Sequence, residues 1–147
     1  MLDLKCQIDI GNFLQNSFSH LEIINIEKYK KVVRSAFNDD EKELIESTFE
    51  MGLIDRRESP ETLKKYVAMM KAIVAPFQEY GDFDFTSSEF VQTTRDLSVQ
   101  FTQALEFSAP PKDLIFLHRK LGGIFGLMKR CRAKIALRPY MEDILNS

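Results

Sequence analysis

Hydrophobic and polar residues alternate along the first ten positions of the chain. The apolar positions of this alternation are Leu2, Leu4, Cys6, Ile8 and Ile10. A repeat of two residues places them on one face of a β-strand. A single strand leaves its backbone groups and its apolar face without a partner, and no later segment shows a comparable alternation. We therefore expect residues 1–11 to form a strand or arm that pairs with another copy, folds back on itself, or has lost its natural neighbour.

After this arm the apolar positions recur at helical spacing. The expected helices cover residues 26–37, 41–51, 60–75, 88–108 and 112–132, followed by a short helix that starts at Pro139. Asp40 precedes the second helix as a cap, and Gly52 is placed to end it. Ser59 followed by Pro60 is a typical helix start, and Pro76 is expected to stop that helix.

The connection from Gln78 to Thr86 reads as a loop, with exposed aromatic residues between acids in "EYGDFDF". No internal repeat and no low-complexity tract interrupts the chain. The sequence therefore predicts an all-α domain, a bundle of five to six helices with one short N-terminal strand. The chain of 147 residues forms a single helical domain, 1–147, with the arm at 1–11 and a terminal helix at 139–147.

The segment 112–132 combines a helical apolar stripe with three glycines. The stripe consists of Leu114, Leu117, Leu121, Ile124, Phe125 and Met128. Gly122, Gly123 and Gly126 fall on another side of the helix, although each glycine costs about 1 kcal/mol relative to alanine. We expect these glycines to allow the close approach of a second backbone, so that this helix packs on two sides and is central to the fold.

Charge is unevenly distributed along the chain. Residues 110–140 carry eight Lys or Arg against one Asp, a net charge of +7, so the remainder carries −9 of the total of −2. Such polarity indicates either an acidic external partner or pairing with the protein's own acidic helices, and the internal pairing is favoured. No nucleic-acid partner is expected, because the basic segment lacks interleaved exposed aromatics and a known nucleic-acid motif.

Several classes of function find little support in the composition. The apolar runs are shorter than the roughly 20 residues that span a bilayer, so no transmembrane segment is expected. No signal peptide is expected, because the N-terminus lacks a cationic start followed by an apolar stretch. Cys6 and Cys131 are read as reduced thiols of a cytoplasmic protein, and no metal and no cofactor is expected. His118, beside Arg119 and Lys120, is a conceivable general base, but no Ser or Cys nearby in the sequence suggests a nucleophilic pair.

Three stretches resemble the UbiB/AarF-like atypical kinases, a family associated with ubiquinone biosynthesis. They are "EMGLIDRRESPETL", "YGDFDFTSSEF" and "PPKDLIFLHRKLGGIFGLMKRCRAKI", and His118, Arg119 and Lys120 lie in the family-like "FLHRK" motif of the third. The resemblance covers residues 20–138. It implies a helical region similar to the C-terminal lobe of a kinase-like fold.

The same resemblance implies that the catalytic parts are missing. Family kinases carry the ATP-binding lysine, the nucleotide loop, the KxGQ extension and the catalytic loop ahead of this region, and none of these motifs occurs in the chain. "MLDLK" is similar to the family's metal-binding "LDFG" strand, which makes Asp3 a possible metal-binding relic, although Lys5 stands in place of the glycine. One carboxylate without the other groups cannot organise phosphoryl transfer.

The sequence therefore predicts a non-catalytic interaction domain, a truncated or split kinase remnant that contacts a protein partner or itself through Leu2, Leu4, Ile8 and Ile10. One alternative is a lipid- or isoprenoid-binding helical module with a cavity lined by Phe125, Leu121 and Phe101. The other is an enzyme with an unrecognised site near His118.

Overall fold

The computed structural model describes residues 23–109 and 112–147, and for residues 23–25, 112–118 and 121 the backbone alone. The elements in chain order are α2 (Ile23–Phe37), α3 (Glu41–Met51), α4 (Pro60–Gln78), β1 (Phe83–Asp84), α5 (Ser88–Ala104), α6 (Lys112–Arg130), β2 (Lys134–Ile135) and α7 (Arg138–Asn146). The all-α class is confirmed for the described part, which holds these helices and one short two-stranded ladder.

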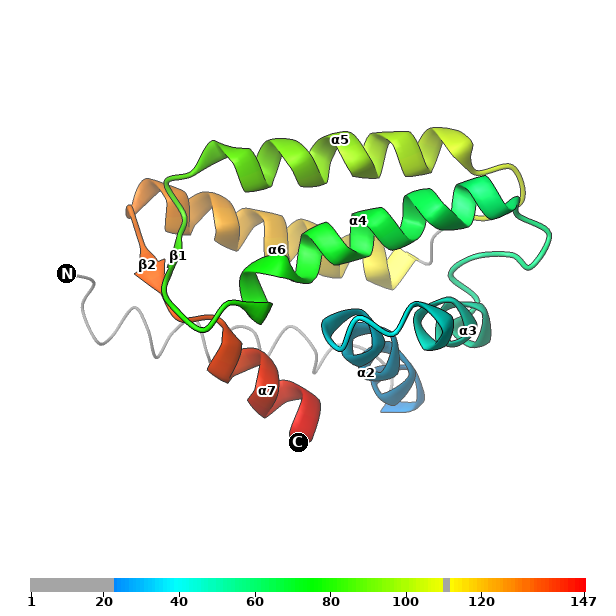
Figure 1. The fold of residues 1–147 in the computed structure, drawn as a ribbon, viewed down its shortest axis with the longest axis horizontal. Helices are drawn as coiled ribbons and strands as arrows, with labels where there is room; N and C mark the ends of the chain where they lie inside the picture. The colour runs from blue at the N-terminus through cyan, green and yellow to red at the C-terminus, as the bar shows by residue number, and fades with distance from the viewer. Residues whose placement is uncertain (1–22, 110–111) are drawn as a thin grey trace.

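The helix α4 is the central element of the described residues (Figure 1). It contacts α5 along one side and α2, α3 and α7 on others. The helix α6 reaches the same core through Phe125, whose ring packs against Phe77 of α4 and Phe90 of α5. The side chains of residues 112–118 and 121 lie outside the described part, so the expectation that the 112–132 helix is central stays a prediction.

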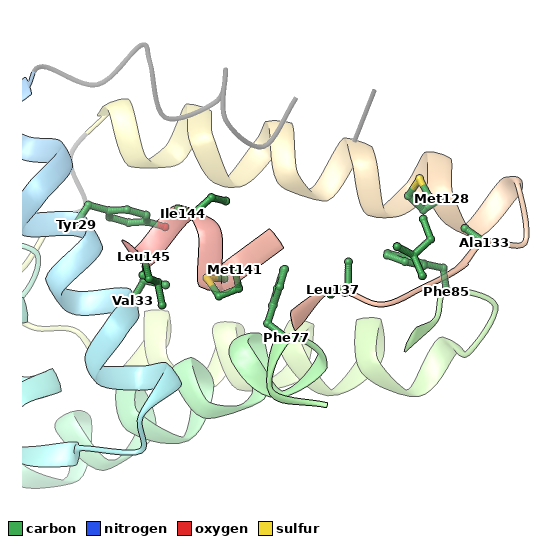
Figure 2. Packing of buried hydrophobic residues seen from close by; sticks show 11 residues of the cluster. Tyr29, Val33, Phe77, Phe85, Met128, Ala133, Leu137, Met141, Ile144 and Leu145 are labelled. Atoms are coloured by element: carbon green, nitrogen blue, oxygen red, sulfur yellow. The ribbon is translucent and has the colours of Figure 1, made fainter. Parts of the chain in front are cut away.

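Two clusters of buried side chains hold these helices together. The first joins α2, α4, α6 and α7 (Figure 2), and it contains Tyr29, Val33, Phe77, Phe85, Met128, Ala133, Ile135, Leu137, Met141, Ile144 and Leu145. The second joins α2, α3 and α4, and it contains Val32, Ala36, Leu44, Ile54, Tyr66, Val67, Met69 and Val74. Because α2 and α4 contribute to both clusters, these two helices connect the halves of the core.

The helix ends follow the local signals in the sequence. The Asp40 side chain accepts the N–H of Glu43 at 3.0 Å, and the Ser59 hydroxyl accepts the N–H of Thr62 at 3.1 Å. Gly52 takes a left-handed conformation with φ of 74°, and its N–H donates to the carbonyl of Phe49 at 3.0 Å. These groups satisfy backbone donors and acceptors that a helix end leaves free. The caps predicted at Asp40, Gly52 and Ser59 are confirmed.

The predicted stop at Pro76 is wrong, because α4 continues to Gln78. Pro76 lies in the last turn of the helix, where its missing N–H removes a single hydrogen bond close to the end. Pro76 and Phe77 are both buried, so the last turn is retained by packing against the core. Burial of this turn offsets a local signal that favours termination.

The stretch read as an open loop is also different in the structure. Residues 83–84 pair antiparallel with residues 134–135, with Phe83 opposite Ile135 and Asp84 opposite Lys134. Tyr80 is exposed as expected, but Phe83 is half-buried and Phe85 is buried. The Phe85 ring lies 5.2 Å from that of Phe125, centroid to centroid. The exposure predicted for the two aromatics between acids is therefore confirmed for Tyr80 and wrong for Phe83, which is half-buried.

Replacing Gly52 with alanine is expected to lower the free energy of unfolding by about 1 kcal/mol. A Cβ at φ of 74° is strained even though nothing lies within 4 Å of it. Urea denaturation followed by circular dichroism measures the change. Gly81→Ala is the matched control, because a Cβ there also meets open space and no positive φ is required. An equal loss in both variants would contradict the backbone explanation.

Candidate functional site

The residues predicted for the N-terminal arm lie outside the described residues. They are Asp3, read as a metal-binding relic, and the contact residues Leu2, Leu4, Ile8 and Ile10. Their roles stay predictions.

The family-like motif at residues 118–120 lies in α6. The side chain of His118 is outside the described part, so the alternative of a catalytic site around it stays a prediction. Arg119 and Lys120 are exposed to solvent. The described structure therefore presents the two cations of this motif outward.

The three glycines of α6 lie on its exposed surface. A Cβ built at Gly122, Gly123 or Gly126 meets nothing within 4 Å. Residues Ile124, Phe125 and Met128 carry the opposite, core-facing side, in agreement with the predicted apolar stripe. The second backbone expected against the glycines is therefore not found among the described residues, and their role in helix packing stays a prediction.

Most cations of the basic segment face solvent without a carboxylate partner in the described ranges. Arg119, Lys120, Lys129, Arg130 and Arg132 are all exposed, and none of them forms an ion pair there. The favoured explanation, in which this charge is neutralised by the protein's own acidic helices, is not supported by these contacts.

Two other cations of the segment do meet acids. The Lys134 ammonium lies 3.9 Å from an oxygen of Asp84, and Arg138 lies 2.7 Å from Glu142. Internal pairing therefore explains the cations at the end of the basic segment. The cations of α6 and of the turn after it form no ion pair in the described part.

Glu58 forms a buried polar clamp between two loops. One carboxylate oxygen accepts the backbone N–H of Phe107 at 2.7 Å and that of Ser108 at 3.0 Å. The same oxygen accepts the Ser108 hydroxyl at 2.9 Å, and the N–H of Glu106 also donates to the carboxylate, at 3.1 Å. The N–H of Asp55 in turn donates to the Ser108 hydroxyl at 2.8 Å. The clamp thus fixes the segment that follows α5 against the turn that precedes α4.

The clamp changes the acidity of Glu58. Burial raises the pKa of the carboxyl, but the N–H groups of Phe107 and Glu106 and the donors of Ser108 outweigh it, and the pKa lies below its ordinary value. The carboxylate is therefore ionised at neutral pH and acts as an acceptor that orders backbone. Sequence reasoning missed Glu58, although it lies within the family-like stretch "RRESPETL", because its donors come from about 50 residues away.

Other buried polar groups are also used to hold the helices. The Tyr66 hydroxyl and the Thr48 hydroxyl are 2.8 Å apart, and burial raises the pKa of Tyr66 to about 12. The Lys30 ammonium donates to the carbonyl oxygen and the hydroxyl of Ser147, at 3.0 and 3.2 Å. Arg34 donates to the carbonyl of Leu145. These contacts join α3 to α4 and α2 to the end of α7.

Arg138 connects the start of α7 with the end of α4. Its guanidinium donates to the carbonyl of Gln78 at 2.7 Å and lies over the rings of Tyr80 and Phe37, at 4.1 and 5.1 Å from their centroids. The highly exposed Tyr80 is thus held against a cation by a cation–π contact. Arg138 is a structural cation in this arrangement.

The cavity that a lipid-binding module needs is not formed by the two rings expected to line it. Phe125 packs against Phe77, Phe85 and Phe90, whereas Phe101 packs against Tyr66 with the ring centroids 5.3 Å apart. The two phenylalanines therefore fill separate clusters.

Among the side chains described in residues 26–109, 119–120 and 122–147, no group of three or more His, Cys, Asp or Glu is arranged to hold a metal ion. Among the helices described, none combines the length and the apolar character needed to cross a bilayer.

Comparison with known proteins shows a distant relationship. No family model matches the chain. It is 25% identical over 115 residues to the mitochondrial atypical kinase COQ8B of Rattus norvegicus, and the aligned region covers 78% of this chain and 22% of that protein. It is 21% identical over 119 residues to the mitochondrial atypical kinase coq-8 of Caenorhabditis elegans, and the aligned region covers 81% of this chain and 16% of that protein. The chain thus spans about a fifth of the length of these relatives. These matches support a relationship to the UbiB family of atypical kinases over a helical region that makes up most of this chain.

Proposed function

We propose that the chain is a non-catalytic helical interaction domain related to a segment of the UbiB-family kinases. The observation that carries this proposal is that the buried polar side chains form hydrogen bonds that hold the scaffold together. Glu58 orders backbone, the hydroxyls of Thr48 and Tyr66 bond to each other, and Lys30 binds the end of α7. These groups act within the scaffold, and the family's nucleotide-binding motifs do not occur in the sequence.

The proposed mode of action is contact with a protein partner or with a second copy through the N-terminal strand. Leu2, Leu4, Ile8 and Ile10 would form the apolar contact face, and the backbone of the strand would add to a sheet of the partner. This mode uses the alternation of residues 1–10 as a recognition element and requires no chemistry from the helices.

A titration of the chain with Mg-ATP tests the non-catalytic part of the proposal. Isothermal titration calorimetry is expected to show no binding at micromolar concentrations, because phosphoryl transfer needs a lysine, phosphate-binding amides and metal-binding acids in one place. Saturable binding in that range would contradict the proposal.

Removal of residues 1–10 is expected to abolish self-association. Light scattering on the intact chain should then give about twice the monomer mass of 17.1 kDa, and the shortened chain should give the monomer mass. Leu4→Asp with Ile8→Asp should act like the deletion, since both carboxylates enter the apolar face. Lys5→Asp with Gln7→Asp, on the polar face, is the matched control. An oligomeric mass unchanged by the deletion would count against the strand as the contact.

A further inference from the structure

The solvent-facing side of α6 carries a group of cations that form no ion pair with the described acids. It carries Arg119 and Arg130 in the centre, with Lys120 and Lys129 on the flanks and Arg132 just beyond the helix end. All five are exposed and none forms an ion pair in the described part. We propose that this surface, called here the α6 outer face, binds an acidic helix of a partner protein.

Charge complementarity determines the kind of partner. The sequence contains no Asp or Glu between Asp113 and Glu142, so the face has no acid of its own within reach along the chain. A second copy placed on the same face would bring arginine and lysine against arginine and lysine, and juxtaposed like charges oppose docking. The proposed partner is therefore a different protein that supplies the acids, and this contact is separate from the one proposed for the N-terminal strand.

The geometry of the face favours a helix over other acidic ligands. At 100° per residue Arg119, Gly123, Gly126 and Arg130 fall within a sector of about 60°, opposite the core-facing Met128. The two arginines are eleven residues apart, which is about 16 Å along the axis. Acids about three turns apart on a docked helix would match them. A nucleic acid would gain little here, because this sector offers no aromatic ring for stacking.

The strip between the two arginines has the shape that helix packing uses. Gly122 and Gly126 are one turn apart, and a Cβ at either position meets open space. Small residues at this spacing let a second helix approach closely. The exposed Leu127, with 58% of its surface accessible, borders the strip and supplies an apolar contact. Glycine lowers the stability of a helix, and no described contact at these positions offsets that loss. Contacts with a docked helix would offset it.

The test uses the full chain and two designed peptides of about 20 residues. Each peptide carries an alanine stripe along one helical face, flanked by glutamates in the first and by lysines in the second. Fluorescence anisotropy is expected to show binding of the glutamate peptide and none of the lysine peptide. Equal binding of both peptides, or binding of neither, would overturn the proposal.

Charge reversal tests which residues form the contact. Arg119→Glu with Arg130→Glu is expected to weaken binding of the glutamate peptide about tenfold and to create binding of the lysine peptide. Lys28→Glu with Lys64→Glu, which reverses two exposed cations on α2 and α4, is the matched control and should leave both affinities unchanged. An equal effect of the two double variants would show a general response to net charge and overturn the assignment to α6.

Substitution of the glycines separates helix docking from simple attraction of anions. Gly123→Leu with Gly126→Leu should raise the thermal stability of the chain, because leucine favours a helix and the positions are open. The same variant should weaken binding of the glutamate peptide about tenfold by blocking close approach. Undiminished peptide binding, or heparin binding as tightly as the peptide, would identify a general polyanion surface and refute the helix. Deletion of residues 1–10 should leave peptide binding unchanged. The contact through α6 and the contact proposed for the N-terminal strand can therefore fail independently of each other.

Discussion

Replacement of Leu44 with alanine is expected to lower the free energy of unfolding by about 3 kcal/mol. Leu44 is 1% exposed and belongs to the cluster that joins α2, α3 and α4. Its truncation removes apolar contacts and leaves a cavity beside Val32 and Tyr66, which packing of the surrounding helices cannot fully close. Thermal and urea denaturation measure the loss. For a chain of this length the melting temperature should fall by roughly 6–12 °C.

Leu127→Ala is the matched control for this variant. It removes the same atoms from a side chain that is 58% exposed, so the expected change stays within about 0.5 kcal/mol. A Leu44→Ala variant that loses no more stability than Leu127→Ala would contradict the packing of α3 against α2 and α4.

The features that could be predicted from sequence are those decided by neighbours in the chain. The cap at Asp40 and the left-handed turn at Gly52 depend on residues within one helical turn, and both are found. The Ser59-Pro60 start of α4 is of the same kind. The apolar stripe of α6 also follows from local spacing, and Ile124, Phe125 and Met128 do face the core.

The features that were missed depend on segments far apart in the chain. Phe85 is buried because its N–H donates to the carbonyl of Ala133, at 3.0 Å, and because Phe125 covers its ring. Nothing near Phe85 in the sequence announces either contact. Pro76 stays within α4 for a similar reason, since the last turn of that helix packs against the core.

The glycine side of α6 could likewise be predicted only in part from the sequence. Periodicity identified the glycine side of α6 but not its environment, because a small-residue strip is equally suited to a neighbour in the same chain and to a partner protein. Only the described fold shows that Gly122 and Gly126 face open space, between cations that no described acid neutralises.

Replacement of Glu58 with alanine is expected to cause a second large loss of stability. The backbone N–H groups of Glu106, Phe107 and Ser108 all donate to this carboxylate, and the variant removes their common acceptor. Donors that lose their acceptor in a part-buried site are costly. Urea denaturation should show a much larger loss than Glu46→Ala, the control, since Glu46 forms only an exposed ion pair with Arg56. Similar losses in the two variants would contradict the clamp.

The pH dependence of Glu58→Gln then isolates the contribution of the charge. The pKa of the Glu58 carboxyl is lowered in the folded protein from an ordinary value of 4.5, so the folded state binds the proton less readily than the unfolded state. Its stabilising effect is therefore fully present above the unfolded pKa and is lost as the pH falls through the lower folded pKa. Glutamine keeps one carbonyl acceptor but cannot ionise. The intact chain should exceed the variant in stability at pH 7, and the difference should shrink below about pH 4. A difference that stays constant between pH 7 and pH 3 would show that shape alone, and not the negative charge, orders the segment after α5.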